Sequence, residues 1–295
     1  MRIAANLGVL DEVELIESCI QHLRAIGVDI IVVMDLGSID GTADRLVSFA
    51  KDPDVTVIRL RQDEDPWGFP ARIYEKTIAE FAVERVLFLD ADEFWLPKSG
   101  NLKTTATLAA ADALSVRRLN IPLVAGRPVL PTDLSPAGYH DIYLVASGRT
   151  NADRALEREH DLVWIMTEGS PKTIVNPAKV DGVGMGHHQV FKKQGTQPNV
   201  VRPDDLIIAH APFSTSARFR RKLENIDRSL ATFGHRLVGP QAWHWRRWLQ
   251  IAREGKVDQE FRRQILTEEQ FQAHLRDGTI QSAASVLEAM ATGNT

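Results

Sequence analysis

The chain has 295 residues, of which 44% are hydrophobic and 25% are charged, as in an ordinary globular protein. Its formal net charge of -4 argues against nucleic acid or an acidic membrane surface as a partner. Cys19 is the one cysteine, which excludes an internal disulfide. No stretch approaches the roughly 20 apolar residues that span a bilayer, and residues 1–6 resemble a strand more than a signal peptide. We therefore expect a cytoplasmic protein without a transmembrane segment.

The first ninety residues predict alternating strands and helices. Alternating units of this kind form parallel sheets with right-handed crossovers, so we expect an α/β fold with a mostly parallel central sheet flanked by helices. The pattern weakens after Trp95 and becomes mostly helical from Ser214. The expected strands are 3–7, 29–34, 55–60, 85–89, 115–123, 162–166, 172–175 and 206–209, and the expected helices are 11–26, 42–50, 70–82, 106–113, 218–233, 241–253, 259–265, 268–276 and 280–290.

Carboxylates follow one of these strands directly. The apolar run 86–89 suits a strand buried on both faces, and Asp90, Asp92 and Glu93 come next. They would emerge at the carboxyl end of the strand, where open α/β sheets bind ligands. Because neighbouring carboxylates repel each other, a divalent cation with bound phosphates is an economical neutraliser. The alternative is that the two Asp residues cap a following turn or helix.

Polar residues stand at the ends of other predicted strands. Asn6 and Asp35 follow the first and second strands, and His210 follows the apolar run 206–209. Asp35 either forms the next turn or accepts hydrogen bonds from a nucleobase or ribose. His187 and His188 would face opposite ways on a strand, so only one of them could enter a site.

Two segments carry a family resemblance. Residues 35–42, Asp-Leu-Gly-Ser-Ile-Asp-Gly-Thr, resemble the D-x-G-S-x-D-G-T signature of family 2 glycosyltransferases. Residues 89–94, Leu-Asp-Ala-Asp-Glu-Phe, resemble their DxD motif in a form typical of a bacterial branch. A weaker resemblance continues through 171–173, 187–188, 210–213 and 219–222. The resemblance implies a GT-A fold, a nucleotide-diphosphate sugar donor (a UDP-sugar favoured), Mn²⁺ or Mg²⁺ as cofactor, and inversion at the anomeric carbon.

The resemblance also implies roles for individual residues. Asp92 would bind the metal directly, Asp90 would contact the metal through water or the ribose, and His210 would complete the metal shell. Asp35 would contact the base. The other candidates for cofactor binding are Asn6 and Leu7 beside Asp35, Arg72 as a contact to base or phosphate (or an ordinary surface arginine), and Lys172 as a phosphate-binding cation.

An inverting transfer needs a general base for the acceptor hydroxyl. No spacing rule selects it, and the catalytic candidates are Asp141 and Glu168, with Glu93 close to the metal and Asp133 and Asp161 in the same region. Trp67 could border the donor pocket. The Trp243–Trp248 cluster is either a platform for a sugar or lipid or, as we favour, a helix that packs its tryptophans into the core.

The sequence thus favours a soluble, metal-dependent glycosyltransferase in bacterial glycan or polysaccharide synthesis, with an unknown glycan, lipid-linked or small-molecule acceptor. We expect a catalytic domain at 1–213, divided into a nucleotide-binding half (1–97) and an acceptor half (98–213), and a helical extension at 214–295. One alternative is a non-catalytic nucleotide- or carbohydrate-binding module. A less favoured one is an Asp-nucleophile phosphatase, whose Asp-x-Asp usually lies on the first strand and is followed by Thr, whereas Phe94 stands here.

Overall fold

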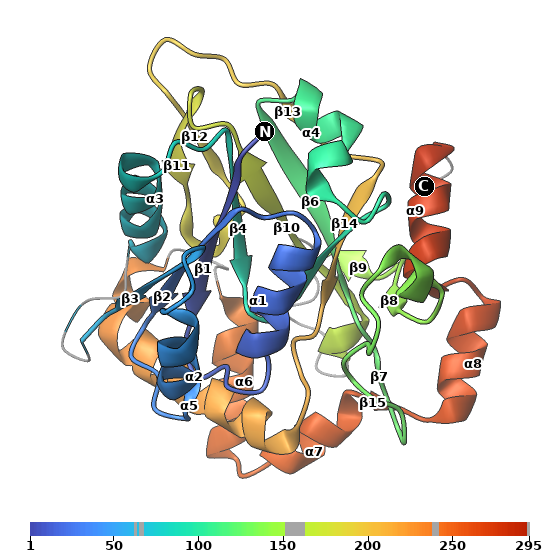
Figure 1. Cartoon of the computed structure of the whole chain (residues 1–295). Helices are drawn as coiled ribbons and strands as arrows, with labels where there is room; N and C mark the ends of the chain where they lie inside the picture. Colours follow the sequence, from blue (N-terminus) through green and yellow to red (C-terminus); the bar gives the residue numbers. More distant parts are fainter. Residues whose placement is uncertain (62–63, 65–67, 151–162, 238–241, 294–295) are drawn as a thin grey trace.

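The computed structural model describes residues 1–295 except 62–63, 65–67, 151–162, 238–241 and 294–295 (Figure 1). A ten-stranded sheet in the order β3-β2-β1-β4-β10-β6-β14-β5 forms the centre, with β13 paired to β6 and β9 paired to β10. Helices flank this sheet, as Figure 1 shows. The α/β class predicted from the sequence is therefore confirmed.

The first four strands form the parallel part of the sheet. They are β1 (Ile3–Val9), β2 (Ile30–Asp35), β3 (Val55–Arg59) and β4 (Arg85–Asp90). Their connections contain α1 (Ile16–Ala25), α2 (Thr42–Phe49) and α3 (Phe69–Glu80). Because strand side chains alternate between the two faces, Ile3 and Leu7 pack into a cluster that contains α1, while Ala4 packs into another that contains α3. The carboxyl ends of these strands consequently share one edge.

Beyond β4 the sheet is mixed. β10 (Thr167–Val175) runs antiparallel to both β4 and β6 (Ala113–Asn120). β14 (Leu206–His210) runs parallel to β6, and β5 (Glu93–Pro97) pairs antiparallel with β14 at the far edge. The carboxyl ends of β4, β6 and β14 therefore meet beside the first residues of β5.

The C-terminal residues pair with earlier segments of the chain through two short strands. Strand β15 pairs with β7, and β16 pairs with β8. Helices α5, α6 and α7 lie at the lower end of Figure 1, where β4 ends. The remaining elements are η1 (Leu102–Thr104), α4 (Ala106–Ala110), β7 (Leu123–Val124), η2 (Pro136–His140), β8 (Tyr143–Val145), β9 (Arg149–Thr150), η4 (Trp164–Met166), β11 (Val180–Val183), η5 (Met185–His187), β12 (Val190–Lys192), β13 (Val200–Val201), α5 (Ser216–Phe233), η6 (Gly234–Arg236), α6 (Trp243–Arg253), α7 (Val257–Arg263), β15 (Ile265–Leu266), α8 (Glu268–Arg276), β16 (Ile280–Ser282) and α9 (Ala283–Ala291).

Some predicted boundaries were wrong. The helix expected from Asp11 begins only at Ile16, because Asp11 adopts φ 58° and joins the neighbouring turn. Its backbone N–H donates to Ser38 Oγ, and its Oδ1 accepts from the Ile39 N–H. The described part of the expected strand 162–166 is a 3-10 helix, and 280–282 is a strand before the last helix, because pairing with β8 outweighs helix propensity.

Candidate functional site

The turn between β4 and β5 places three carboxylates side by side. Asp90 ends β4 and Glu93 begins β5, with Asp92 between them. Glu93 Oε2 accepts a hydrogen bond of 3.0 Å from the Asp90 N–H, and the Asp92 carbonyl accepts one of 2.8 Å from the Ala211 N–H. These two bonds fix the turn and tie it to the end of β14.

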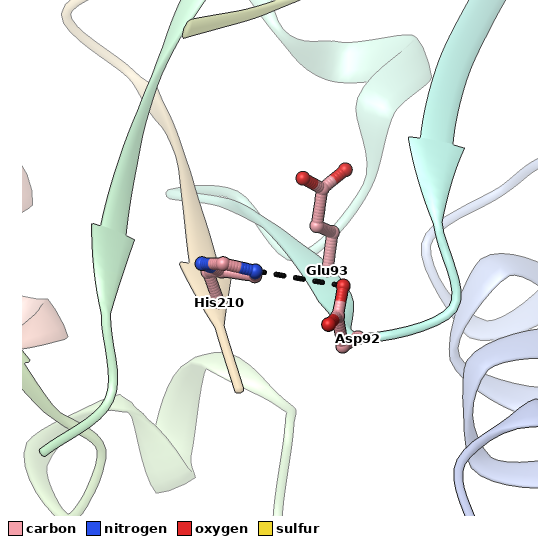
Figure 2. A group of neighbouring side chains, drawn as sticks. All are labelled: Asp92, Glu93 and His210. Atoms are coloured by element: carbon pink, nitrogen blue, oxygen red, sulfur yellow. Dashed lines mark ion pairs between the residues drawn. The ribbon is translucent and has the colours of Figure 1, made fainter. Parts of the chain in front are cut away.

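Three side chains of this region form a candidate metal site. Asp92, Glu93 and His210 each offer one ligand atom, and these atoms all lie within 4.8 Å of one another. Figure 2 shows His210 reaching across from β14 toward Asp92, with 3.5 Å between His210 Nε2 and Asp92 Oδ1. All three residues are buried, so a bound cation would be largely shielded from bulk water.

Hydrogen bonds determine which nitrogen of His210 is free. The Asn120 amide nitrogen donates to the carbonyls of Ile165, at 3.1 Å, and Thr167, at 2.7 Å. Its Oδ1 therefore faces His210 and accepts a hydrogen bond of 2.7 Å from Nδ1. Burial lowers the pKa of His210 to about 4, so the imidazole is neutral near pH 7. Its Nε2 lone pair points toward Asp92, which is the arrangement of a metal-ligating histidine.

Glu93 is already engaged by other groups. Its Oε1 accepts a hydrogen bond of 2.7 Å from Arg118 Nη1 and lies 3.3 Å from Lys172 Nζ, while Oε2 holds the Asp90 N–H. Burial raises the pKa of this carboxyl. Asp92 Oδ1 and His210 Nε2 are consequently the better donors. An oxygen and an imidazole nitrogen suit Mn²⁺, and Mg²⁺ would take further oxygens from water and phosphate.

The structure brings Lys172 to the carboxylates, as a partner of Asp90. Lys172 Nζ lies 2.6 Å from Asp90 Oδ2, and the lysine side chain is buried. Burial opposes ionisation of Asp90, but the charge and hydrogen bond of Lys172 act together with His187 and lower the pKa of Asp90 to about 2. The Asp90 side chain is still 43% exposed, so it remains accessible to a ligand.

Asp92 is neutralised by two cations from α5. Its Oδ2 lies 3.1 Å from Arg218 Nη2 and 3.3 Å from Lys222 Nζ. Arg218 also donates to Glu12 Oε2 from Nε, at 2.9 Å, and from Nη2, at 2.7 Å. Burial opposes ionisation of Asp92, yet Lys222 and its other cationic neighbours hold its pKa well below the usual range. Burial raises the pKa of Glu12 to about 7.

Asp35 has the turn-forming role considered for it, while its contact to a nucleobase or ribose stays a prediction. Its Oδ1 accepts hydrogen bonds from the backbone N–H of Gly37, at 3.2 Å, and of Ser38, at 2.8 Å, which shapes the turn after β2. Its Oδ2 is buried without a hydrogen-bond partner among the described residues, and Arg59 Nε lies 3.5 Å away as an ion-pair partner. One carboxylate oxygen of this buried side chain therefore has no hydrogen bond among the described residues.

The other residues predicted to bind the cofactor have different surroundings. Asn6 lies within β1 and not after it, because this strand continues to Val9, and its Oδ1 accepts a 2.6 Å hydrogen bond from Thr77. Leu7 is buried in the core. Arg72 lies near the start of α3 and forms a 3.2 Å ion pair with Glu64. Asn6, Leu7 and Arg72 therefore have partners other than the carboxylates of the turn between β4 and β5.

The candidates for the general base are dispersed. Glu168 forms a two-bond ion pair with Arg117, at 2.9 and 2.8 Å. Arg117 and Arg118 are consecutive on β6 and point to opposite faces, so Glu168 lies across the sheet from Glu93. Asp141 follows η2 and lines a cavity of about 380 Å³, as does Asp133. Asp161 and Trp67 lie outside the described residues. The catalytic roles of Asp141 and Glu168 stay predictions.

His187 and His188 lie at a 3-10 turn, so the alternation expected on a strand does not apply. His187 stacks on Phe88, with 5.5 Å between ring centroids, and its Nδ1 lies 3.4 Å from Lys172 Nζ. His188 Nδ1 lies 2.6 Å from the Pro171 carbonyl. The His187 ring therefore lies next to the Lys172 ammonium.

The tryptophans of α6 support the packing interpretation. Trp248 is 2% exposed and packs against Phe213, Phe219 and Trp164. Trp164 in turn lies 6.3 Å from the His210 ring, measured between centroids. The aromatic cluster around Trp248 therefore packs next to His210 of the candidate metal site.

Sequence reasoning missed several residues that contact the site. Asn120 ends a strand and could have been found by the same logic that selected Asp35. Arg218 and Lys222 are four residues apart on one helix face, a pattern that indicates two neighbouring side chains but no partner for them. Glu12 and Arg118 carried no distinctive signal.

The fold and the site together define a mixed α/β protein with a carboxylate–histidine cluster at the carboxyl edge of its sheet. No protein-family model matches the chain, and a search of curated proteins found no match. Among solved structures, S. aureus TarS 1-349 aligns at 13% identity with a TM-score of 0.36, over 77% of this chain and 65% of that one. The same fragment in complex with UDP aligns at 15% identity with a TM-score of 0.36, over 70% and 62%.

A third similar structure is glucosyl-3-phosphoglycerate synthase from Mycobacterium tuberculosis, solved with Mn²⁺, UDP and phosphoglyceric acid. It aligns at 21% identity with a TM-score of 0.29, over 40% of this chain and 43% of that one. The chain thus spans less than two thirds of these solved chains. All three TM-scores lie below 0.5. Within the described residues, no helix is long and apolar enough to cross a membrane.

Proposed function

We propose that this protein is a metal-dependent, inverting glycosyltransferase that uses a nucleotide-diphosphate sugar, with UDP as the favoured nucleotide. The observation that carries the proposal is the His210 Nε2 lone pair, which is fixed by Asn120 and faces Asp92 at the carboxyl edge of the sheet. A neutral imidazole facing a buried carboxylate is a ready pair of ligands for a divalent cation. Asp92 belongs to the glycosyltransferase-like motif at residues 89–94, which favours a diphosphate as the third partner.

The residues around Asp92 and His210 can each bind a different part of the sugar-nucleotide donor. Asp35, at the end of β2, has one carboxylate oxygen without a hydrogen bond among the described residues, which we propose for a base N–H. Asp90 is accessible at the end of β4 and suits a ribose hydroxyl or a metal-bound water. Lys172 and Glu93 keep Asp90 in place. The nucleoside would therefore lie along the carboxyl ends of β2 and β4, with its diphosphate toward Asp92.

The chemistry that we propose is one displacement at the anomeric carbon. The acceptor oxygen forms a bond to this carbon as the bond to the phosphate oxygen breaks, and the acceptor proton passes to a carboxylate base. A divalent cation at Asp92 and His210 would supply stabilisation of the negative charge on the departing diphosphate. Of the two candidate bases we propose Asp141, because Glu168 is held in an ion pair with Arg117 across the sheet from Glu93. The acceptor class that we propose is a hydroxyl of a glycan, a lipid-linked sugar or a small molecule.

Hydrolysis of UDP-sugars tests this proposal without knowledge of the acceptor. Wild-type protein is incubated with UDP-glucose or UDP-N-acetylglucosamine and Mn²⁺, with EDTA or with Asp92→Asn as controls. We expect slow UDP release that needs both the cation and Asp92. At high enzyme concentration, NMR spectra recorded faster than the free sugar mutarotates should show an initial excess of the β anomer. An initial excess of the α anomer would contradict inversion. UDP binding without turnover of any UDP-sugar or GDP-sugar would favour the non-catalytic binding module.

A further inference from the structure

The carboxylates around Asp92 are already engaged by cations of the protein itself. Four carboxylates, Glu12, Asp90, Asp92 and Glu93, are joined by ion pairs to four cations, Arg118, Lys172, Arg218 and Lys222. A divalent cation added to this cluster would bring two uncompensated positive charges. A protein cation that moves away from its carboxylate offsets only one of these charges, so we expect an anion to enter with the metal as well.

Arg218 is not free to move. Its guanidinium donates to Glu12, to Asp92, and to the carbonyls of Ala211, at 3.1 Å, and Pro212, at 3.0 Å. Its side chain is only 4% exposed. Moving it would break several charge-assisted hydrogen bonds and leave Glu12 buried without its partner.

Lys222 is held much more loosely. Its Nζ makes two long contacts, at 3.3 Å to Asp92 Oδ2 and at 3.5 Å to the Pro212 carbonyl. Its side chain is 30% exposed, on the face of α5 one turn beyond Arg218. A lysine ammonium on its four-carbon stem can exchange one oxygen partner for another within a few ångströms at little cost.

We propose that Lys222 exchanges partners, neutralising Asp92 in the metal-free site and contacting the diphosphate once a divalent cation occupies Asp92. This inference rests on the proposed function, since it assigns a leaving-group contact to the same site. The exchange makes Lys222 a competitor of the metal in the absence of nucleotide and a ligand of the nucleotide in the presence of metal. Removal of its charge therefore changes the two affinities in opposite directions, which loss of a merely structural contact would not do.

The test measures Mn²⁺ binding by electron paramagnetic resonance of the free ion, and UDP binding by calorimetry at saturating Mn²⁺. The variants are Lys222→Met, which keeps the apolar stem, and Lys222→Gln, which keeps a polar end. The matched control is Arg220→Met, which removes one positive charge from the same helix at a residue paired with Asp258. Circular dichroism confirms that each variant is folded.

For both Lys222 variants we expect Mn²⁺ alone to bind about threefold to tenfold more tightly, and UDP with Mn²⁺ to bind about tenfold more weakly, the size of one partly exposed charge contact. Arg220→Met should leave both affinities within about twofold. Weaker or unchanged Mn²⁺ binding in the Lys222 variants would overturn the exchange alone. Wild-type protein that binds neither Mn²⁺ nor UDP would instead overturn the proposed function, and the exchange with it.

Discussion

Asn120 Oδ1 accepts a hydrogen bond of 2.7 Å from His210 Nδ1, and this contact decides which histidine nitrogen faces Asp92. The two residues are register partners on β6 and β14, so the sheet itself aligns them. Two backbone carbonyls orient Asn120 in turn, because its amide NH₂ can donate to them whereas its Oδ1 cannot. The candidate metal site thus depends on a residue that would never touch the metal.

Asn120→Ala is therefore expected to weaken Mn²⁺ binding about 10- to 100-fold, as the loss of such a supporting contact does in other metal sites. The reason is that His210 loses both its fixed tautomer and its ring orientation. Mn²⁺ titration of the variant measures the effect, with His210→Ala as the reference for complete loss of the ligand. Equal Mn²⁺ affinity in Asn120→Ala and wild type would show that this contact does not matter for the metal.

Asp92→Asn should reduce UDP-sugar hydrolysis at least about 100-fold, because a buried metal ligand and its charge are both lost. It should also lower the free energy of unfolding by about 3 kcal/mol, since Arg218 would remain buried with half of its compensating charge removed. Turnover and urea unfolding check the two effects, with Asp227→Asn, at an exposed residue of α5, as control. Undiminished turnover in Asp92→Asn would remove this carboxylate from the mechanism.

Glu168→Gln distinguishes between the candidate bases. Because Glu168 is paired with Arg117 across the sheet from Glu93, we expect UDP-sugar hydrolysis to stay within about twofold of wild type, while stability falls by about 1 to 3 kcal/mol from the broken ion pair. The same assay applied to Asp141→Asn tests the other candidate. A large loss of turnover in folded Glu168→Gln would reinstate Glu168 as the base.

His22, on α1, makes stability depend on pH. Burial lowers the pKa of His22 to about 4, while its Nε2 lies 2.7 Å from the Trp95 carbonyl. Since the folded pKa is below the unfolded value of 6.5, the unfolded state binds more protons between these values, and stability falls as pH drops from about 6.5 toward 4. Comparison of urea unfolding at pH 7 and pH 4 should show wild type losing about 3 kcal/mol more than His22→Gln. Parallel losses in both proteins would contradict this assignment.

Trp248→Ala tests the packing role of the aromatic cluster. Truncation of this buried ring should cost about 3 to 5 kcal/mol of unfolding free energy. Trp245, which is only partly buried, should cost less when it is replaced by alanine, and thermal unfolding of both variants gives the comparison. A stable Trp248→Ala protein with impaired sugar binding would favour the platform interpretation instead.

The parallel half of the fold was predictable because its strands are short and mostly apolar, and its helices carry one apolar face. Local patterns also placed Asp35 and Asp90 at strand ends. Asn6 was misplaced because a polar residue inside a strand, hydrogen-bonded to Thr77 on a helix, looks in sequence like the residue that ends the strand. The mixed half was harder to predict, because β5 does not pair with β4 or β6, the strands next to it in the sequence. Its partner is β14, which lies more than 100 residues later.

The contacts of the site likewise divide into those that local sequence patterns predict and those that they do not. Asp90, Asp92 and His210 could be selected from strand ends, but the ion pairs of Asp92 with Arg218 and Lys222 join segments more than 120 residues apart. Such pairings depend on how α5 packs, which no local pattern specifies. The tautomer of His210 likewise required knowledge of what Asn120 contacts.

The central claim is that a divalent cation binds between Asp92 and His210 together with a nucleoside diphosphate. Crystals grown with Mn²⁺ and UDP, measured at an energy where manganese scatters anomalously, test it most directly. We predict an anomalous peak at coordination distance from Asp92 Oδ1 and His210 Nε2, with the diphosphate oxygens completing the shell. Ordered UDP with no anomalous peak at these two atoms, or a peak elsewhere in the protein, would contradict the claim.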